Sequence, residues 1–125
     1  MEEDNITGKI IQCAIKVHNS LGPGLLESAY KECLYTELRK CGLEVEKEKP
    51  LPLIYEEVKL ERRYKVDLFV ENKIVVKIKS IEAVHNIHLA QTLTYLKLIG
   101  ARIGLLMNFN VLRLKDGIKR IFNGY

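Results

Sequence analysis

The sequence predicts an α/β (α+β) fold, a single domain over residues 1–125 in which helices flank a central mixed β-sheet. A chain of 125 residues suits one domain with its own apolar core. Its composition, 47% hydrophobic and 29% charged, excludes a disordered chain. The spacing of apolar residues along the chain predicts elements in the order α-α-β-β-β-β-α-β, followed by a tail of uncertain type. This order predicts helices packed on one mixed sheet.

The first 40 residues predict two helices separated by a turn. Over residues 5–18 the apolar residues recur at spacings of three and four, namely Ile6, Ile10, Ala14 and Val17. Residues 20–24 contain two glycines and Pro23, which favour a turn and end this helix. Helical spacing resumes over residues 25–40, and Gly42 is a suitable C-terminal stop.

The middle of the chain predicts strands. Residues 43–55 alternate with period two and contain Pro50 and Pro52, which an edge strand tolerates. A turn at Glu56 and Glu57 leads through residues 58–60 toward a main hairpin. That hairpin joins residues 64–70 to residues 73–79 through a tight turn at Glu71 and Asn72.

Alternation along the main hairpin decides which side chains share a face. Lys77 and Lys79 point one way with Val75, and the intervening residues Val76 and Ile78 point toward a core covered by helices. Asp67 on the neighbouring strand can reach the lysine face if the register allows it. We therefore expect Asp67, Lys77 and Lys79 on one polar face.

The last 43 residues predict a helix, a strand and a short final element. The helix spans residues 83–99, with a buried stripe of Leu89, Leu93, Leu96 and Ile99 or Gly100, and with His88, Gln91, Thr92 and Tyr95 displaced around it. Residues 101–109 form a strand, and residues 112–123 supply the final element.

Composition and charge limit the cellular compartment and the kinds of partner that we expect. The acidic N-terminus and the lack of an apolar run near 20 residues argue against a signal peptide and a membrane helix, so we expect a cytoplasmic protein. Three cysteines without a C-x-x-C pair predict reduced thiols and no zinc site. A net charge of +4 tolerates a polyanionic partner without requiring one.

The residues alone support only a modest chemical hypothesis. Asp67 and the two lysines can be simple cross-strand partners on a solvated face, and this is the plainest interpretation of their spacing. The turn at residues 22–24 lacks the lysine and hydroxyl of a phosphate-binding loop. His85 and His88 share a helical face but have no carboxylate at the next ligand spacing, which favours a surface role.

A resemblance extends this hypothesis. The segment Gly24-Leu25-Leu26-Glu27-Ser28-Ala29-Tyr30 resembles the signature of the GxxExxY protein family, and residues 91–97, 104–109 and 114–120 also match that family in order and spacing. The family is assigned to the PD-(D/E)XK nuclease-like superfamily. The resemblance therefore implies a restriction-endonuclease-like core.

The resemblance also implies a site. Glu27 and Asp67 would bind Mg²⁺ or Mn²⁺, Lys79 would be the motif lysine, and Gln91 with Tyr95 would form a flanking polar pair. The cation would polarise a phosphate and activate water for phosphodiester hydrolysis, with DNA expected as partner in preference to RNA.

One position departs from the family pattern. Lys77 stands two residues before the motif lysine, where the resemblance calls for a glutamate. An ammonium removes a ligand and repels the cation, so we expect impaired metal binding. Three alternatives stay open: Glu82 or Glu71 replaces the missing carboxylate, Lys77 is an inactivating change introduced into an otherwise active protein, or Lys77 pairs with Asp67 and Glu27 in place of the metal.

Three functions remain compatible with the sequence. The first is a nuclease-like enzyme with Glu27, Asp67 and Lys79 as its surviving parts. The second is a non-catalytic module that binds nucleic acid or a protein. The third is a homo-oligomeric structural subunit that associates through its helix faces and the edge strands of residues 43–60.

Overall fold

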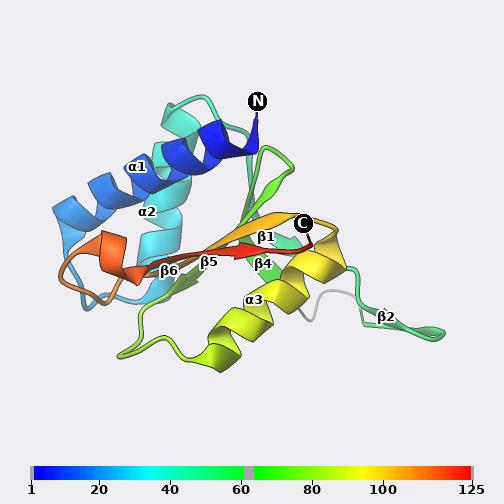
Figure 1. Ribbon diagram of the computed structural model, residues 1–125. Coiled ribbons are helices and arrows are strands. Elements are labelled where there is room, and N and C mark those ends of the chain that lie inside the picture. The colour runs from blue at the N-terminus through cyan, green and yellow to red at the C-terminus, as the bar shows by residue number, and fades with distance from the viewer. Residues whose placement is uncertain (1, 61–63, 125) are drawn as a thin grey trace.

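Three helices sandwich a five-stranded sheet in this computed structural model, which describes residues 2–60 and 64–124. Helices α1 and α2 cover one face of the sheet and α3 covers the other (Figure 1). The helices are α1 (Glu3–Leu21), α2 (Glu27–Lys40) and α3 (Asn86–Ile99), with a 3₁₀ turn η1 (Leu114–Gly117). The predicted α/β (α+β) fold class is confirmed. Within the described ranges, no helix combines the length and apolarity needed to cross a bilayer.

The sheet is mixed and has the strand order β1-β4-β5-β6-β7. Its strands are β1 (Val45–Pro50), β4 (Lys65–Val70), β5 (Ile74–Lys79), β6 (Ile103–Asn108) and β7 (Ile118–Phe122). Only β5 and β6 are parallel, and α3 forms the crossover between them. The tail of uncertain type is therefore a strand, β7, that pairs antiparallel with β6 and completes the sheet.

The predicted helices α1 and α2 are confirmed, with small shifts at their ends. Helix α1 extends two residues before and three residues after the predicted range. It ends at Gly22, whose φ of 72° is open to glycine at no steric cost. Helix α2 begins at Glu27, two residues later than predicted, and Gly42 follows its C-terminus with φ 83°.

The prediction of one edge strand over residues 43–55 was wrong at its C-terminal end. β1 forms the sheet edge, whereas β2 (Ile54–Tyr55) and β3 (Val58–Lys59) form a separate two-stranded hairpin. That hairpin projects from the body of the molecule (Figure 1). The predicted turn at residues 56–57 is confirmed, since Tyr55 pairs with Val58. Pro50 is the last residue of β1, and Pro52 lies between the two parts, because a proline cannot donate to a ladder.

The main hairpin pairs β4 with β5 and needs one more turn residue than predicted. Val70 pairs with Ile74, so the turn comprises residues 71–73. Glu71 and Asn72 both have positive φ, at 53° and 55°. The pairing of β4 with β5 extends from the turn as far as Leu68 and Val76. Asp67 and Lys77, the next residue on each strand, are not paired with each other.

The apolar core has two parts because helices cover both faces of the sheet. Val76 and Ile78 belong to the larger cluster with α1 and α2, as predicted. Val75 belongs to a second cluster beneath α3, together with Leu96, and is fully buried. The residues expected on one polar face, Asp67, Lys77 and Lys79, are half-buried and not fully solvated, because α3 packs over Val75 on the same face.

The buried stripe of α3 also differs from the prediction. Thr92 and Leu96 are its fully buried residues, and Thr92 satisfies its hydroxyl by donating to the His88 carbonyl at 3.0 Å. Leu89 is only half-buried. Gly100 is an exposed C-terminal cap with left-handed φ of 78°.

Candidate functional site

Asp67 and Lys77 form an ion pair at the point where the main hairpin stops pairing. The Lys77 Nζ lies 3.5 Å from Asp67 Oδ2, and their side chains are 15% and 21% exposed. The same Oδ2 accepts a hydrogen bond from the Ile78 amide at 2.7 Å. The Asp67 carboxylate thus accepts the hydrogen bond of a β5 amide beyond the end of the β4–β5 pairing. It also neutralises the half-buried Lys77 ammonium. The expectation that Asp67 reaches the lysine face is confirmed.

Tyr95 encloses Lys77 from the α3 side. The Lys77 Nζ lies 5.5 Å from the centre of the Tyr95 ring, within the range of a cation–π interaction. Gln91, one turn earlier on α3, is exposed, and its side chain makes no hydrogen bond to another described residue. The structure therefore brings Asp67, Lys77 and Tyr95 together and does not add Gln91 to that contact.

Glu27 is held at the edge of the site by a different set of contacts. As the first residue of α2, it lies at the positive end of the helix dipole. Its Oε2 accepts a hydrogen bond from the Ser80 amide at 3.2 Å, and the Ser80 hydroxyl donates to the Leu25 carbonyl at 2.6 Å. Glu27 is therefore anchored to the end of β5 by Ser80, a residue that the sequence did not single out.

The Gly, Glu and Tyr of the segment 24–30 have distinct structural roles. Gly24 has a φ of 94°, a backbone conformation that residues with a side chain rarely adopt. The Tyr30 hydroxyl donates to the Gly22 carbonyl at 2.6 Å and accepts from the Leu25 amide at 3.1 Å. Its fully buried ring stacks on Phe109 at 4.5 Å between centroids. Tyr30 thus pins the loop that leads directly to Glu27.

A row of side chains crosses the sheet through Lys77. Lys77 pairs with Leu106 of β6, and Leu106 pairs with Lys119 of β7. Laterally paired residues point to the same face, so Lys119 lies on the α3 face with Lys77, at about 10 Å between Cα atoms. Lys119 was not predicted, because its position depends on a strand register that the sequence does not specify.

Lys79 lies on the same face as Lys77, paired with Asn108. It is half-buried and has no ion pair within the described part of the chain. Asn108 is buried and fastens the loop after β5, because its side chain bonds both the amide and the carbonyl of Ile81 at 3.1 Å and 3.0 Å. These bonds hold the loop after β5 in place beside the candidate site.

The residues present do not fit a divalent cation. Magnesium and manganese require several oxygen ligands around one position. No group of three or more His, Cys, Asp or Glu residues suited to a metal occurs among residues 2–60 and 64–124. One oxygen of Asp67 is already shared by an ammonium and an amide, and the Glu27 carboxylate is bonded to the Ser80 amide.

The alternatives for the missing carboxylate also have defined places. Glu71 lies in the hairpin turn, where its Oε2 accepts from the Glu44 amide at 2.6 Å, and this is the opposite end of β5 from Lys77. Glu82 is exposed in the loop after β5. The expected pairing of Lys77 is confirmed for Asp67, whereas Glu27 bonds Ser80 instead.

Comparisons with known proteins agree with this architecture. No curated protein and no solved structure matches the chain. The family model for the PD-(D/E)XK nuclease superfamily matches residues 4–121, which include every helix and strand of the sandwich almost in full. The chain therefore belongs to the PD-(D/E)XK nuclease superfamily.

Proposed function

We propose that this chain is a nuclease-related protein in which metal-dependent hydrolysis of DNA is impaired by Lys77. Members of the superfamily usually use Mg²⁺ or Mn²⁺. The single observation that carries the proposal is the Lys77–Asp67 ion pair, which puts an ammonium beside the carboxylate proposed as a metal ligand.

The magnitude of the electrostatic effect supports impairment. Two unit charges about 4 Å apart interact with roughly 4 kcal/mol at an effective dielectric of 20. The Lys77 ammonium gains such an attraction to Asp67, and an incoming cation must displace it and then bear its repulsion. Since each 1.4 kcal/mol changes affinity about tenfold, even half of this energy weakens metal binding by more than tenfold.

A cleavage assay with three proteins tests this proposal. Plasmid, linear duplex and single-stranded DNA are incubated with Mg²⁺ or Mn²⁺ and the native chain, Lys77→Glu, or Lys77→Glu combined with Asp67→Asn. We expect cleavage by Lys77→Glu alone, and the double variant controls for contaminating nuclease. Cleavage by the native chain as fast as by Lys77→Glu would contradict impairment. A folded Lys77→Glu variant that binds Mn²⁺ but leaves all substrates intact would contradict the assigned role of Lys77.

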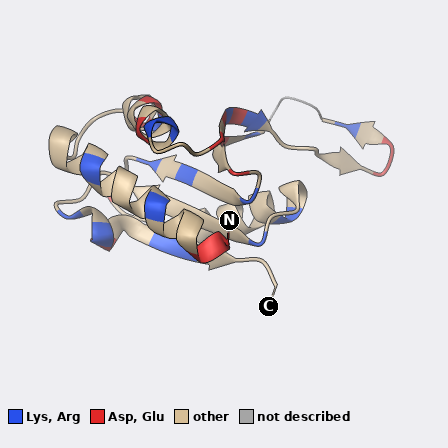
Figure 2. Cartoon of the chain, turned by 90° about the horizontal axis from the view of Figure 1, so that it is seen from above, with Lys and Arg blue, Asp and Glu red and all other residues tan. Residues whose placement is uncertain are grey.

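A second candidate function is non-catalytic binding of nucleic acid, with DNA preferred to RNA. Residues 101–125 contain five basic residues and one acidic residue, a net charge of +4 that equals the charge of the whole chain. The strand that leads to the C-terminus, β7, contains the adjacent basic residues Lys119 and Arg120, and Lys and Arg are drawn blue in Figure 2. Lys79 and Lys119 have no ion pair within the described ranges, whereas most basic residues on α1, α2 and β1 are paired with carboxylates. Unpaired cations on the α3 face are suited to phosphates.

Salt dependence tests this second candidate. Binding of a DNA duplex is measured by fluorescence anisotropy at several salt concentrations for the native chain, Lys119→Gln and the matched variant Lys9→Gln. Loss of one phosphate contact lowers the slope of log affinity against log salt by about 1, and we expect this for Lys119→Gln only. A flat salt dependence, or an equal loss for both variants, would exclude the α3 face as the binding surface. Tighter binding to an RNA duplex would contradict the preference for DNA.

A further inference from the structure

Two cysteines from different helices meet at the surface between α1 and α2. The Cys13 Sγ lies 3.3 Å from the Cys41 Sγ, although the residues are 28 positions apart in the chain. Cys13 is buried in the middle of α1, and Cys41 is the exposed C-cap of α2. A disulfide has a sulfur–sulfur distance of about 2.05 Å, so a closure of little more than 1 Å would join the two thiols.

The surroundings of the pair favour an anionic reagent. An open cleft of about 290 Å³ lies at the two thiols and is lined by Lys9, Gln12, Cys13, Lys16, Glu37 and Cys41. Lys16 pairs with Glu37 at 3.1 Å, and Lys9 has no ion pair among the described residues. The cleft therefore presents a cation beside an accessible thiol.

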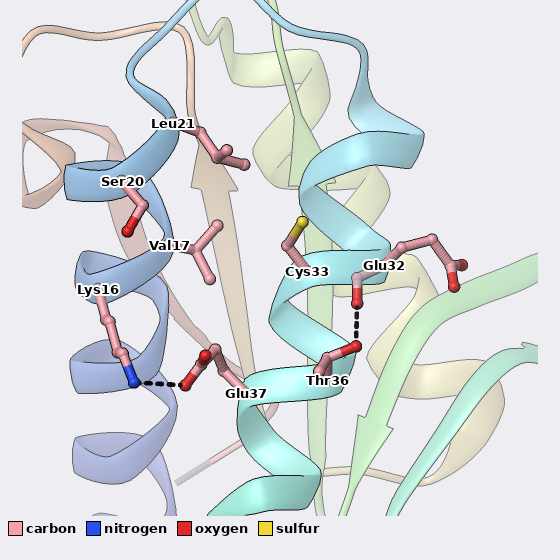
Figure 3. A pocket seen from close by; sticks show the side chains of 8 residues that line it. All are labelled: Lys16, Val17, Ser20, Leu21, Glu32, Cys33, Thr36 and Glu37. Carbon is pink, nitrogen blue, oxygen red and sulfur yellow. Dashed lines mark hydrogen bonds and ion pairs between the residues drawn. The ribbon is translucent and has the colours of Figure 1, made fainter.

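The third cysteine is separate from this pair. Cys33 points into the groove between α1 and α2 that Val17 and Leu21 line, as Figure 3 shows. The Lys16–Glu37 ion pair lines the same groove (Figure 3). Cys33 supplies an internal control for any oxidation assigned to the other two.

We propose that Cys13 and Cys41 are a thiol–disulfide exchange site that low-molecular-weight disulfides, such as glutathione disulfide, convert to an intramolecular disulfide. The two cysteine thiols lose two electrons and two protons. The reagent disulfide accepts both electrons, its sulfur–sulfur bond breaks, and its two thiolates take up the two protons.

The two sulfurs have different roles in this exchange. Cys41 is exposed, and its thiolate attacks the reagent to form a mixed disulfide and release the first thiolate. Burial, followed by the hydrogen bond and charge of Cys41, raises the pKa of Cys13 to about 12, so Cys13 stays protonated during this step. In the mixed disulfide the charge of Cys41 no longer opposes ionisation of Cys13, so Cys13 passes its proton to the departing thiolate as it attacks the Cys41 sulfur and expels that thiolate.

The disulfide would fasten the middle of α1 to the C-terminal end of α2. A cross-link across 28 positions removes conformational entropy from the unfolded chain and should raise the melting temperature by about 10 °C. Glu27 is at the other end of the 14-residue α2, about 20 Å away along the helix, so oxidation should leave the candidate site unchanged.

The experiment equilibrates the native chain, Cys33→Ser and Cys41→Ser with excess glutathione disulfide. Free thiols are titrated in denaturant, peptides are mapped without reduction, and thermal unfolding is followed before and after dithiothreitol. We expect the free thiols of the native chain to fall from three to one. A peptide linking Cys13 to Cys41 should appear, with a reversible rise in melting temperature. Cys33→Ser should oxidise in the same way, and Cys41→Ser should form no internal disulfide.

Several outcomes would overturn the proposal. They are a stable glutathione adduct on Cys41, a disulfide that includes Cys33, and three free thiols after equilibration. A fall in melting temperature on forming the Cys13–Cys41 link would also overturn it, because the link would then strain the native helices. Cys41→Ser alters an exposed residue, so the comparison does not depend on a variant of the buried Cys13.

Discussion

Removing the Tyr30 hydroxyl should loosen the loop that positions Glu27. The Tyr30→Phe variant keeps the ring that stacks on Phe109 but removes the bonds to the Gly22 carbonyl and the Leu25 amide. A hydrogen bond between neutral groups contributes about 1 kcal/mol to stability. We therefore expect a loss of about 2 kcal/mol in the free energy of unfolding and a fall of about 8 °C in melting temperature.

Urea denaturation followed by circular dichroism measures this change, and amide hydrogen exchange locates it. Tyr35→Phe is the matched control, because the Tyr35 hydroxyl accepts only a surface bond from Arg39 at 2.8 Å. We expect less than about 0.5 kcal/mol for that variant. In Tyr30→Phe, the Leu25 amide should lose protection selectively. Equal stability losses in the two variants, or unchanged exchange at Leu25, would refute the role of Tyr30 as the loop's anchor.

Two further predictions concern buried contacts around the sheet. Gly117→Ala should lower the free energy of unfolding by roughly 3 kcal/mol, because the added Cβ would lie 2.2 Å from the Asn108 carbonyl oxygen. Gly8→Ala, which meets no atom within 4 Å in helix α1, should be neutral or stabilising in the same urea assay, and equal effects would contradict this difference. Lys77→Met should cost about 2 kcal/mol by leaving the Asp67 carboxylate without its counterion. Asp67→Asn should restore part of that loss in a double-mutant cycle, and additive losses would argue against coupling.

The local patterns were sufficient to predict the main hairpin and the first two helices. Period-two alternation placed Val76 and Ile78 toward the larger core, and the glycine and proline after α1 marked its end. These features depend on neighbours in the chain, so the local sequence is sufficient to predict them. The same alternation put Lys77 and Lys79 on one face and left the approach of Asp67 to depend on the register, and the ion pair shows that Asp67 does reach Lys77.

The features that sequence could not predict depend on contacts between distant segments. Val75 looked like part of a polar face because its neighbours are lysines, but α3 covers the part of that face around Val75. Thr92 is buried because its hydroxyl bonds within its own helix, which removes the cost of hiding a polar group. Lys119 joins the row of Lys77 only through the β5–β6–β7 register. A single sequence does not encode that register in any local signal.

Calorimetric titration with Mn²⁺ tests the central role of Lys77 most directly. Four proteins are compared: the native chain, Lys77→Glu, the neutral variant Lys77→Gln, and Lys9→Glu as a control for net charge. We predict no measurable binding by the native chain or Lys9→Glu, and at least about a hundredfold tighter binding by Lys77→Glu, with Lys77→Gln between them. Binding of Mn²⁺ by the native chain with the same affinity as Lys77→Glu would contradict the account.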